Sequence, residues 1–185
     1  SKLNKFKIFF VFEEKKFRKN RIYYPKINNF FLISKKDILF KKIKSINPHL
    51  GIIFSFGYIL PKKIINLFEY GIINFHTSIL PYYGGAHPLF WAIRNGEHKT
   101  GITIHYVTEK IDTGPLIKVE EIKIYPDDDR SSISLKLMEL SMINILKLIF
   151  ILSKTRFKSR KEIKNVKIWP KRIPSQSRIS WSYSD

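Results

Sequence analysis

The sequence predicts an α/β protein built on an open, mostly parallel sheet that is flanked by helices. Short apolar segments have the composition of buried strands, and segments of helical periodicity alternate with them. Such alternation is typical of parallel sheets, because a parallel pair of strands needs a crossover connection. Sheets of this kind bind ligands beyond the carboxyl ends of their strands. At 185 residues the chain can form one domain with a tail.

The first half of the chain alternates strand and helix signals. Strands are expected at residues 5–12, 29–33, 50–55 and 72–75. A helix is expected between Ser34, which begins a capping-box-like pattern with Asp37, and Asn47-Pro48, which ends it. A second helix is expected from Pro61 until Gly71, because proline suits the first helical position and glycine the residue after the last turn.

The second half predicts two further helices and two strands. A short helix is expected at 88–95, strands at 101–107 and 116–124, and a long helix from Ser131 onward. The acidic run at 127–129 is interpreted as a cap for this long helix rather than a metal site. We expect one domain over residues 1–153. The basic, Ser- and Pro-containing residues 154–185 are expected to be a linker or surface arm that leads toward an absent C-terminal domain.

The composition indicates a folded and strongly basic protein. Hydrophobic residues make up 44% of the chain, aromatic residues 15%, and the formal net charge is +19. A positive charge of this size favours contact with a polyanion such as RNA. The abundance of Lys, Ile, Asn and Phe, however, is also what an AT-rich genome encodes, so the charge alone leaves RNA binding open.

Several classes of protein are excluded or disfavoured. The chain has no cysteine, which excludes disulfides and thiolate zinc sites, and we expect no bound metal. No apolar run is long enough to cross a bilayer, and the apolar stretch at 8–12 is too short for a signal peptide. A cytoplasmic protein without a membrane partner is therefore expected. Neither an internal repeat nor a GxGxxG phosphate loop is present.

Three polar motifs lie close to the predicted strand ends. They are Asn74-Phe75-His76, the Ser78-Ile79-Leu80-Pro81 turn that follows, and Asp112-Thr113-Gly114 later in the chain. This order resembles the folate-dependent formyltransferase family, which includes methionyl-tRNA, sugar-amine and glycinamide ribonucleotide formyltransferases and the formyltetrahydrofolate hydrolases. The resemblance extends from about residue 48 to 124. It implies a Rossmann-like formyltransferase fold and 10-formyltetrahydrofolate as the formyl donor.

The chemistry of formyl transfer accounts for these residue types. An amine that attacks a formyl carbon produces a tetrahedral oxyanion, which an amide or imidazole donor stabilises. Residues two apart on a strand face the same side, so Asn74 and His76 can converge on one carbonyl. His76 can also accept the amine proton, and Asp112 is the candidate carboxylate partner. The resemblance implies that these three form the catalytic set, with no covalent enzyme intermediate.

The resemblance also implies which residues contact the folate. The pterin is expected in an apolar slot with backbone hydrogen bonds, between residues that precede the Asn-His strand and residues that follow the later strand. The expected wall comprises Phe56, Tyr58, Ile59, Leu60, Ser78, Ile79, Leu80, Pro81, Val107 and Thr108. Phe56 and Tyr58 could equally be core aromatics. Of the five histidines only His76 is assigned a function. His49, His98 and His105 are taken as structural or solvated, and His87 is left unassigned.

The acceptor amine stays open at this stage. Gly84-Gly85 stands where the tRNA and sugar-amine branches usually carry Arg-Gly, which favours the loss of an acceptor contact. His87-Pro88 and His105 resemble the sugar-amine and ribonucleotide enzymes, whereas the tail from Pro170 to Trp181 is similar in order to the tRNA branch. The part before Pro48 is shorter than is usual and lacks a Gly-rich first turn.

Three functions therefore remain as hypotheses. The first is transfer of the formyl group to a primary amine, on methionyl-tRNA (possibly initiator tRNA) or on an amino-sugar nucleotide. The second is hydrolysis of 10-formyltetrahydrofolate, in which water replaces the amine at the same three residues. The third is a catalytically reduced remnant that binds RNA through its basic surface.

Overall fold

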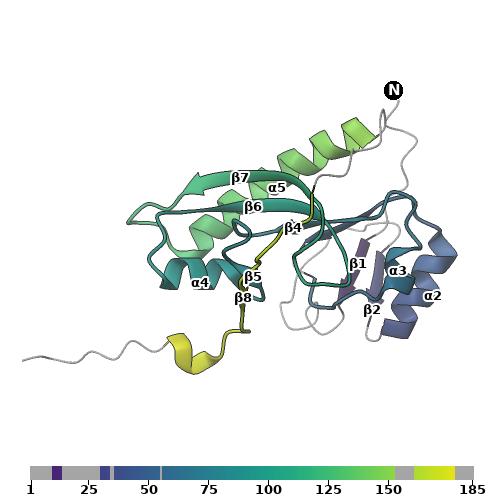
Figure 1. Ribbon diagram of the computed structural model, residues 1–185, viewed down its shortest axis with the longest axis horizontal. Helices are drawn as coiled ribbons and strands as arrows, with labels where there is room; N and C mark the ends of the chain where they lie inside the picture. Colours follow the sequence, from purple (N-terminus) through teal and green to yellow (C-terminus); the bar gives the residue numbers. More distant parts are fainter. Residues whose placement is uncertain (1–9, 14–29, 34–35, 55, 153–160, 178–185) are drawn as a thin grey trace, which may run out of the picture.

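The computed structural model describes residues 10–13, 30–33, 36–54, 56–152 and 161–177 (Figure 1). A four-stranded sheet with the strand order β3-β4-β6-β7 forms its centre. Its strands are β3 (Gly51–Phe54), β4 (Ile72–His76), β6 (Lys99–Tyr106) and β7 (Leu116–Lys123). Two further strand pairs are described. They are β1 (Phe10–Glu13) with β2 (Phe30–Ile33), and β5 (Gly84–Gly85) with β8 (Ile168–Trp169).

The predicted open α/β fold is confirmed, and the sheet is mixed rather than mostly parallel. The β1–β2, β3–β4 and β5–β8 pairs are parallel, whereas β6 runs antiparallel to both β4 and β7. The antiparallel arrangement follows from the connection between β6 and β7, which is a loop too short to cross over as a parallel link requires. Strands β3 and β4 keep the parallel pairing that puts their carboxyl ends at one edge.

Helices flank the sheet and include a long helix that starts where the sequence predicted it. The helices are α2 (Lys36–Ile46), α3 (Lys62–Ile65), α4 (Pro88–Arg94), α5 (Arg130–Leu152) and the 3₁₀ helix η2 (Pro174–Ser177). Asp129 precedes α5, and its Oδ1 accepts a hydrogen bond of 2.7 Å from the Ser132 backbone N–H. The acidic run therefore contributes a cap, as predicted. The expected capping residue Ser34 lies outside the described residues.

Helix α3 is shorter than the sequence predicted. It ends at Ile65, and hydrogen bonds from Leu67 N to Ile64 O and from Phe68 N to Ile65 O continue as tight turns. The apolar residues after Ile65 pack from these turns into the apolar cluster that contains Ile64. Their spacing in the sequence is therefore the same as that of a longer helix. Gly71, at φ 73°, ends the segment in the left-handed conformation that glycine tolerates best.

The two faces of the sheet pack against different helices. Ile73 and Phe75 on β4 join a core cluster with Ile102 and Ile104 of β6 and with residues of α4 and α5. Ile72 faces the opposite side and packs with residues of α2 and α3. Because side chains alternate along a strand, Asn74 and His76 lie on the same face as Ile72. The sheet thus directs both polar residues away from the α5 core.

Candidate active site

The three predicted catalytic residues meet at the carboxyl end of β4. Asp112 comes from the loop between β6 and β7, and its Oδ1 lies 3.5 Å from His76 Nδ1. The Asn74 side-chain amide also donates to Asp112 Oδ1, at 3.5 Å. His76 is 7% exposed, so the ring is largely shielded from water. An amide, an imidazole and a carboxylate therefore share one small, sheltered volume, while their roles stay predictions.

His105 is a fourth member of this cluster, which the sequence reasoning missed by taking it as structural or solvated. It lies directly opposite Asn74 in the antiparallel β4–β6 pair and is 2% exposed. Its Nε2 is 3.3 Å from Asn74 Nδ2 and 3.6 Å from Asp112 Oδ1, while its Nδ1 is 2.8 Å from the Tyr106 carbonyl. Since a carbonyl only accepts, Nδ1 carries a proton and donates to it. Nε2 faces both the Asn74 amide and the Asp112 carboxylate, and it accepts from the amide when unprotonated and donates to the carboxylate when protonated. The feature of the sequence that pointed to His105 is that it is a second histidine, on the strand that pairs with the Asn74 strand.

Asp112 is fixed by its backbone and by its partners. Its φ is 54°, a conformation that Asp tolerates better than most residues, and its Oδ2 accepts a hydrogen bond of 2.7 Å from the Gly85 N–H. Two residues on, a Cβ at Gly114 would lie 1.8 Å from the Tyr106 carbonyl oxygen, so the loop can close only over glycine.

The Asp112 carboxyl group is held in its charged form. Burial raises the pKa of Asp112. The hydrogen bond with His105, the charge of His76 and the Gly85 N–H together lower it by more, so the net pKa lies below the ordinary value. An ionised carboxylate is therefore present beside the His76 ring at neutral pH.

His76 is held on its other side by the loop after the turn. Its Nε2 donates to the Tyr83 carbonyl oxygen at 2.7 Å, which leaves Nδ1 toward Asp112. Burial lowers the pKa of His76, while Asp112 and the Tyr83 carbonyl oppose this shift and His105 adds to it. The net pKa lies below the ordinary value, so neutral His76 presents its lone pair at Nδ1.

A buried hydrogen-bond network fixes the Ser78–Pro81 turn. Ser78 is fully buried, and its hydroxyl donates to the Tyr83 carbonyl at 2.6 Å. Thr103 on β6 donates from Oγ1 to the Ser78 carbonyl at 2.7 Å and accepts from the Leu80 N–H at 3.0 Å. The Leu80–Pro81 peptide bond is cis. The turn is consequently tied both to β6 and to the loop that follows it.

The expected folate wall divides into two groups. Phe56, Leu60 and Val107 share the apolar cluster on the α2–α3 side of the sheet. Leu80 and Pro81 instead line a cavity of about 660 Å³ with Leu116 and residues 161–164. The structure thus leaves the pterin position as a prediction.

The remaining wall residues lie on or beside these groups. Tyr58 packs edge-on against Phe56 with ring centroids 5.4 Å apart, whereas Ile59 is 56% exposed. Thr108 Oγ1 donates to the Lys110 carbonyl at 3.1 Å, within the loop that carries Asp112. Ile79, in the buried turn, is half-buried.

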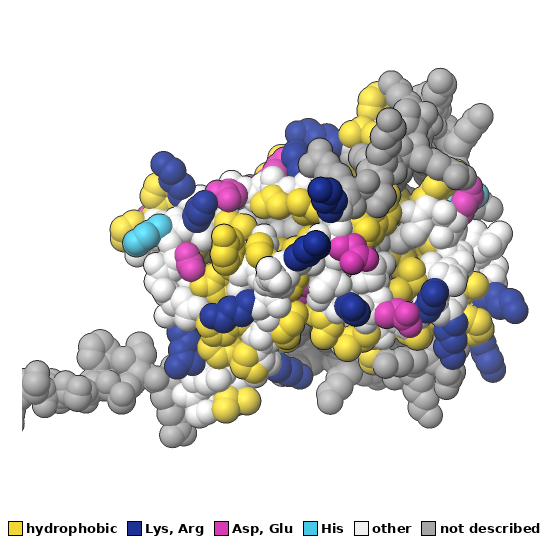
Figure 2. All heavy atoms as spheres, viewed as in Figure 1, with side chains coloured by type: hydrophobic (Ala, Val, Ile, Leu, Met, Phe, Trp, Pro, Cys, Tyr) yellow, Lys and Arg dark blue, Asp and Glu magenta, His cyan; other side chains and the backbone are white. Residues whose placement is uncertain are grey.

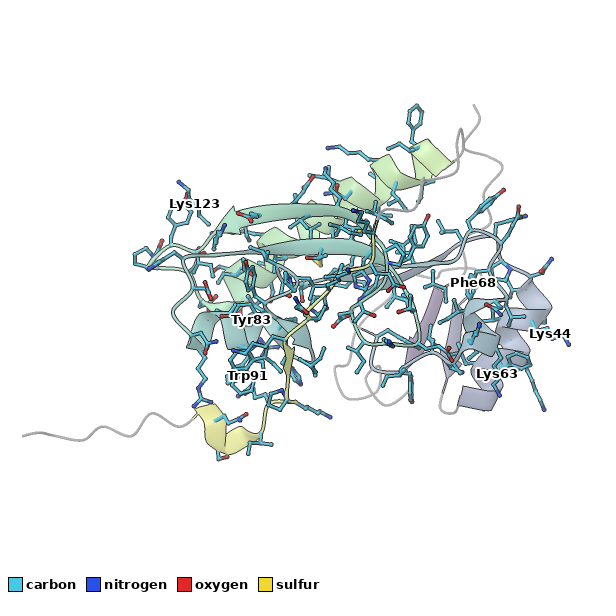
Figure 3. The ribbon with its side chains drawn as sticks, in the orientation of Figure 1. Lys44, Lys63, Phe68, Tyr83, Trp91 and Lys123 are labelled. Atoms are coloured by element: carbon cyan, nitrogen blue, oxygen red, sulfur yellow. The ribbon has the colours of Figure 1, made fainter. Side chains whose placement is uncertain are left out.

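Part of the expected tail packs on the domain. Residues 161–170, named here the strap, pass along the loop after Pro81, and their β8 pairs with β5 (Figure 1). Tyr83 and Trp91 lie beside β8 (Figure 3) and form an aromatic cluster with Trp169. The sequence offered no periodicity here, because the strap is held by backbone pairing and two isolated aromatic contacts.

In the described parts of the chain, no cluster of three or more His, Cys, Asp or Glu residues could hold a metal ion. None of the described helices is long and apolar enough to span a membrane. On the face shown in Figure 2, Lys and Arg side chains are spread among acidic and apolar ones rather than gathered in one patch.

Comparison with known proteins supports the resemblance seen in the sequence. The family model described as formyl transferase matches residues 4–149. Methionyl-tRNA formyltransferase of Thermodesulfovibrio yellowstonii is 35% identical over 150 residues, which are 81% of this chain and 49% of that protein. The enzyme of the same name from Fusobacterium nucleatum is 34% identical over 163 residues, 88% of this chain and 51% of that protein. The chain thus spans about half the length of these relatives.

Solved structures agree on the fold. Methionyl-tRNA formyltransferase from Clostridium thermocellum superposes with a TM-score of 0.64 at 28% identity, covering 94% of this chain and 75% of that one. HypX from Aquifex aeolicus in complex with tetrahydrofolic acid has a TM-score of 0.73 at 20% identity, covering 84% of this chain and 27% of that one. With a family model that matches most of its length, the chain belongs to the formyl transferase family.

Proposed function

We propose that this chain transfers a formyl group from 10-formyltetrahydrofolate to the primary amine of methionyl-tRNA. The observation that carries the proposal is the convergence of Asn74, His76 and Asp112 in one sheltered cluster. The names of the relatives favour methionyl-tRNA over an amino-sugar nucleotide as the acceptor. The proposed acceptor also favours a cytoplasmic location, where translation takes place.

His76 is proposed as the base that receives the amine proton. With its Nε2–H donated to the Tyr83 carbonyl, neutral His76 has its lone pair at Nδ1. As the amine nitrogen forms its bond to the formyl carbon, Nδ1 accepts the proton, and Asp112 stabilises the resulting imidazolium from 3.5 Å. The C–N bond to the folate then breaks, and its nitrogen regains a proton from His76. No group remains attached to the protein.

Asn74 is proposed as the donor to the developing oxyanion. Its amide contacts with His105 and Asp112 are long, at 3.3 and 3.5 Å, so they are weak and the amide can turn one N–H toward a formyl oxygen. Catalytic hydrogen bonds of this kind often tighten only when the substrate is bound.

The folate is proposed to bind beside the parallel end of the sheet. The segment at 56–60 follows β3, and β3 and β4 end at the same edge. Phe56 and Val107 are partly buried there against the apolar cluster that contains Leu60, and Ile59 is 56% exposed. The pterin ring would cover this surface and bring the formyl group to Asn74 and His76.

Turnover assays test the proposal and separate it from its alternatives. The purified chain is incubated with 10-formyltetrahydrofolate alone, with methionyl-tRNA and with an amino-sugar nucleotide. Tetrahydrofolate that appears only with methionyl-tRNA supports the proposal, whereas formate released without an acceptor shows hydrolysis instead. Absence of turnover under all three conditions contradicts the proposal, and salt-sensitive tRNA binding without turnover would indicate an RNA-binding remnant.

A further inference from the structure

The loop at 81–85 supplies one contact to each of two catalytic side chains. The Tyr83 carbonyl accepts from His76 Nε2 at 2.7 Å, and the Gly85 N–H donates to Asp112 Oδ2 at 2.7 Å. Both contacts come from the main chain, so a side-chain change in the loop does not remove them directly. Whatever fixes the backbone of this loop also fixes the relative positions of His76 and Asp112.

The strap holds this loop through three hydrogen bonds. The Lys167 N–H donates to the Pro81 carbonyl at 2.8 Å, and the Gly84 N–H donates to the Lys167 carbonyl at 2.9 Å. The Trp169 indole N–H donates to the Tyr82 carbonyl at 2.9 Å. The bonds therefore bracket Tyr83, whose carbonyl faces His76.

Trp169 also fastens the strap to the rest of the domain. Its ring stacks on Tyr83 with centroids 5.6 Å apart and lies 4.8 Å from the Trp91 ring. Trp91 belongs to α4, and its indole N–H donates to the Pro170 carbonyl at 2.8 Å. Aromatic rings at these distances attract one another in addition to the effect of burying their area. The strap is thus attached to both the loop and a helix.

Glycine at position 84 is what allows this close approach. A Cβ at Gly84 would lie 2.5 Å from Val166 Cγ1 and 2.9 Å from Ile168 Cδ1. A side chain at this position would crowd the Val166 and Ile168 side chains, so these strap residues would have to shift.

We propose that Trp169 is a positioning residue, which acts through the strap to hold the Tyr83 carbonyl against His76 and the Gly85 N–H against Asp112. This inference deepens the proposed function and rests on it for its kinetic readout. Among the described residues, Trp169 makes no hydrogen bond or ring contact with Asn74, His76 or Asp112, so its influence passes through the loop.

The main test is Trp169→Ala in the full chain. We expect kcat to fall roughly 10- to 100-fold, because small misplacements of catalytic groups have effects of this size. The KM for 10-formyltetrahydrofolate should change less than about twofold, since the apolar wall at 56–60 is not touched. Trp169→Phe keeps a stacking ring but not the indole N–H, and should give an intermediate kcat.

A second readout does not depend on turnover. The pKa of His76 is followed by NMR titration, with the neighbouring Asp112 and His105 left intact. The Tyr83 carbonyl supports the protonated ring, so loosening it in Trp169→Ala should lower the pKa of His76. If the wild-type chain shows no turnover, the proposed function fails while this titration still tests the strap.

Ile173→Ala is the matched control. Ile173 follows the strap and is 54% exposed, so kcat and the His76 titration should equal those of the wild type. A folded Trp169→Ala protein with wild-type kcat and wild-type His76 pKa would overturn the inference.

A size-complementation pair keeps the inference testable even if Trp169→Ala does not fold. Gly84→Ala should lower kcat by crowding Val166 and Ile168 of the strap, and adding Val166→Ala removes the closer of the two crowding methyl groups and should restore part of the loss. A wild-type kcat in Gly84→Ala, or no recovery of kcat in the double variant, would contradict the proposed positioning role of the strap.

Discussion

The loop at 78–85 contacts the candidate catalytic residues, the segment at 56–60 belongs to the proposed folate wall, and different forces hold the two. Hydrogen bonds to β6, to the strap and to His76 fix the loop. The segment at 56–60 is held by apolar packing in the cluster that contains Phe56 and Leu60. Hydrogen bonds are directional and fix angles, whereas apolar packing is not directional and tolerates adjustment. The difference suits the proposed chemistry beside the loop and the proposed binding of a flat ring beside the segment at 56–60.

The largest expected effect tests the hydrogen-bonded part of the candidate site. Asp112→Asn keeps the shape of the side chain but removes the negative charge beside His76, so kcat should fall about 10²- to 10⁴-fold. Steady-state turnover with methionyl-tRNA measures the loss, and circular dichroism checks the fold. A rate within threefold of the wild type would remove Asp112 from the catalytic set.

Asn74→Ala should have the next largest effect. Loss of one preorganised donor to an oxyanion lowers kcat about 10²- to 10³-fold, with little change in KM for either substrate. The kcat and KM values are measured separately. An increase in KM with a normal kcat would instead assign Asn74 to ground-state binding.

His105→Gln tests whether His105 supports Asn74 and Asp112 in the hydrogen-bonded network. The substitution removes the imidazole that contacts both Asn74 and Asp112. We expect kcat to fall about tenfold and the pKa of Asp112 to rise, because the partner that lowers it most is gone. Matching kcat and carboxyl titration in variant and wild type would return His105 to a structural role.

The pH dependence follows from the same network. The proposed base must be neutral, and burial sets the pKa of His76 below its ordinary value of about 6.5. The rate should therefore be level at neutral pH and fall about tenfold per unit only below the pKa of His76. Asp112 stays ionised throughout this range because its own pKa is lowered. A rate that falls as pH rises through neutrality would contradict His76 as the base.

The smallest expected effect tests the apolar segment at 56–60. Ile59 is 56% exposed, so Ile59→Ala should leave the melting temperature nearly constant while raising KM for 10-formyltetrahydrofolate a few-fold. Ile143→Ala is the matched control, because Ile143 is 50% exposed on α5. Equal KM values in the two variants would move the pterin elsewhere, for example toward the cavity beside Leu80.

The local patterns predicted most elements of the fold, and the family resemblance predicted three members of the candidate site. Apolar runs located β3 and β4, and the Asn-x-His spacing put two polar side chains on one face of a strand. The same reasoning extended α3 too far, because Leu67 and Phe68 reach the apolar cluster from turns. Apolar spacing reports which residues are buried, and burial can be reached without a helix.

The sequence by itself determined the residue types of the site, the strand that carries Asn74 and His76, and the family to which the chain belongs. Only the tertiary structure decided that His105 faces Asn74, since cross-strand register is a contact between distant segments. Only the tertiary structure also placed the strap against the loop, because backbone pairing between β5 and β8 produces no recognisable side-chain pattern in the sequence. Periodicity encodes which side of one element is buried, while contacts between elements depend on how the whole chain packs.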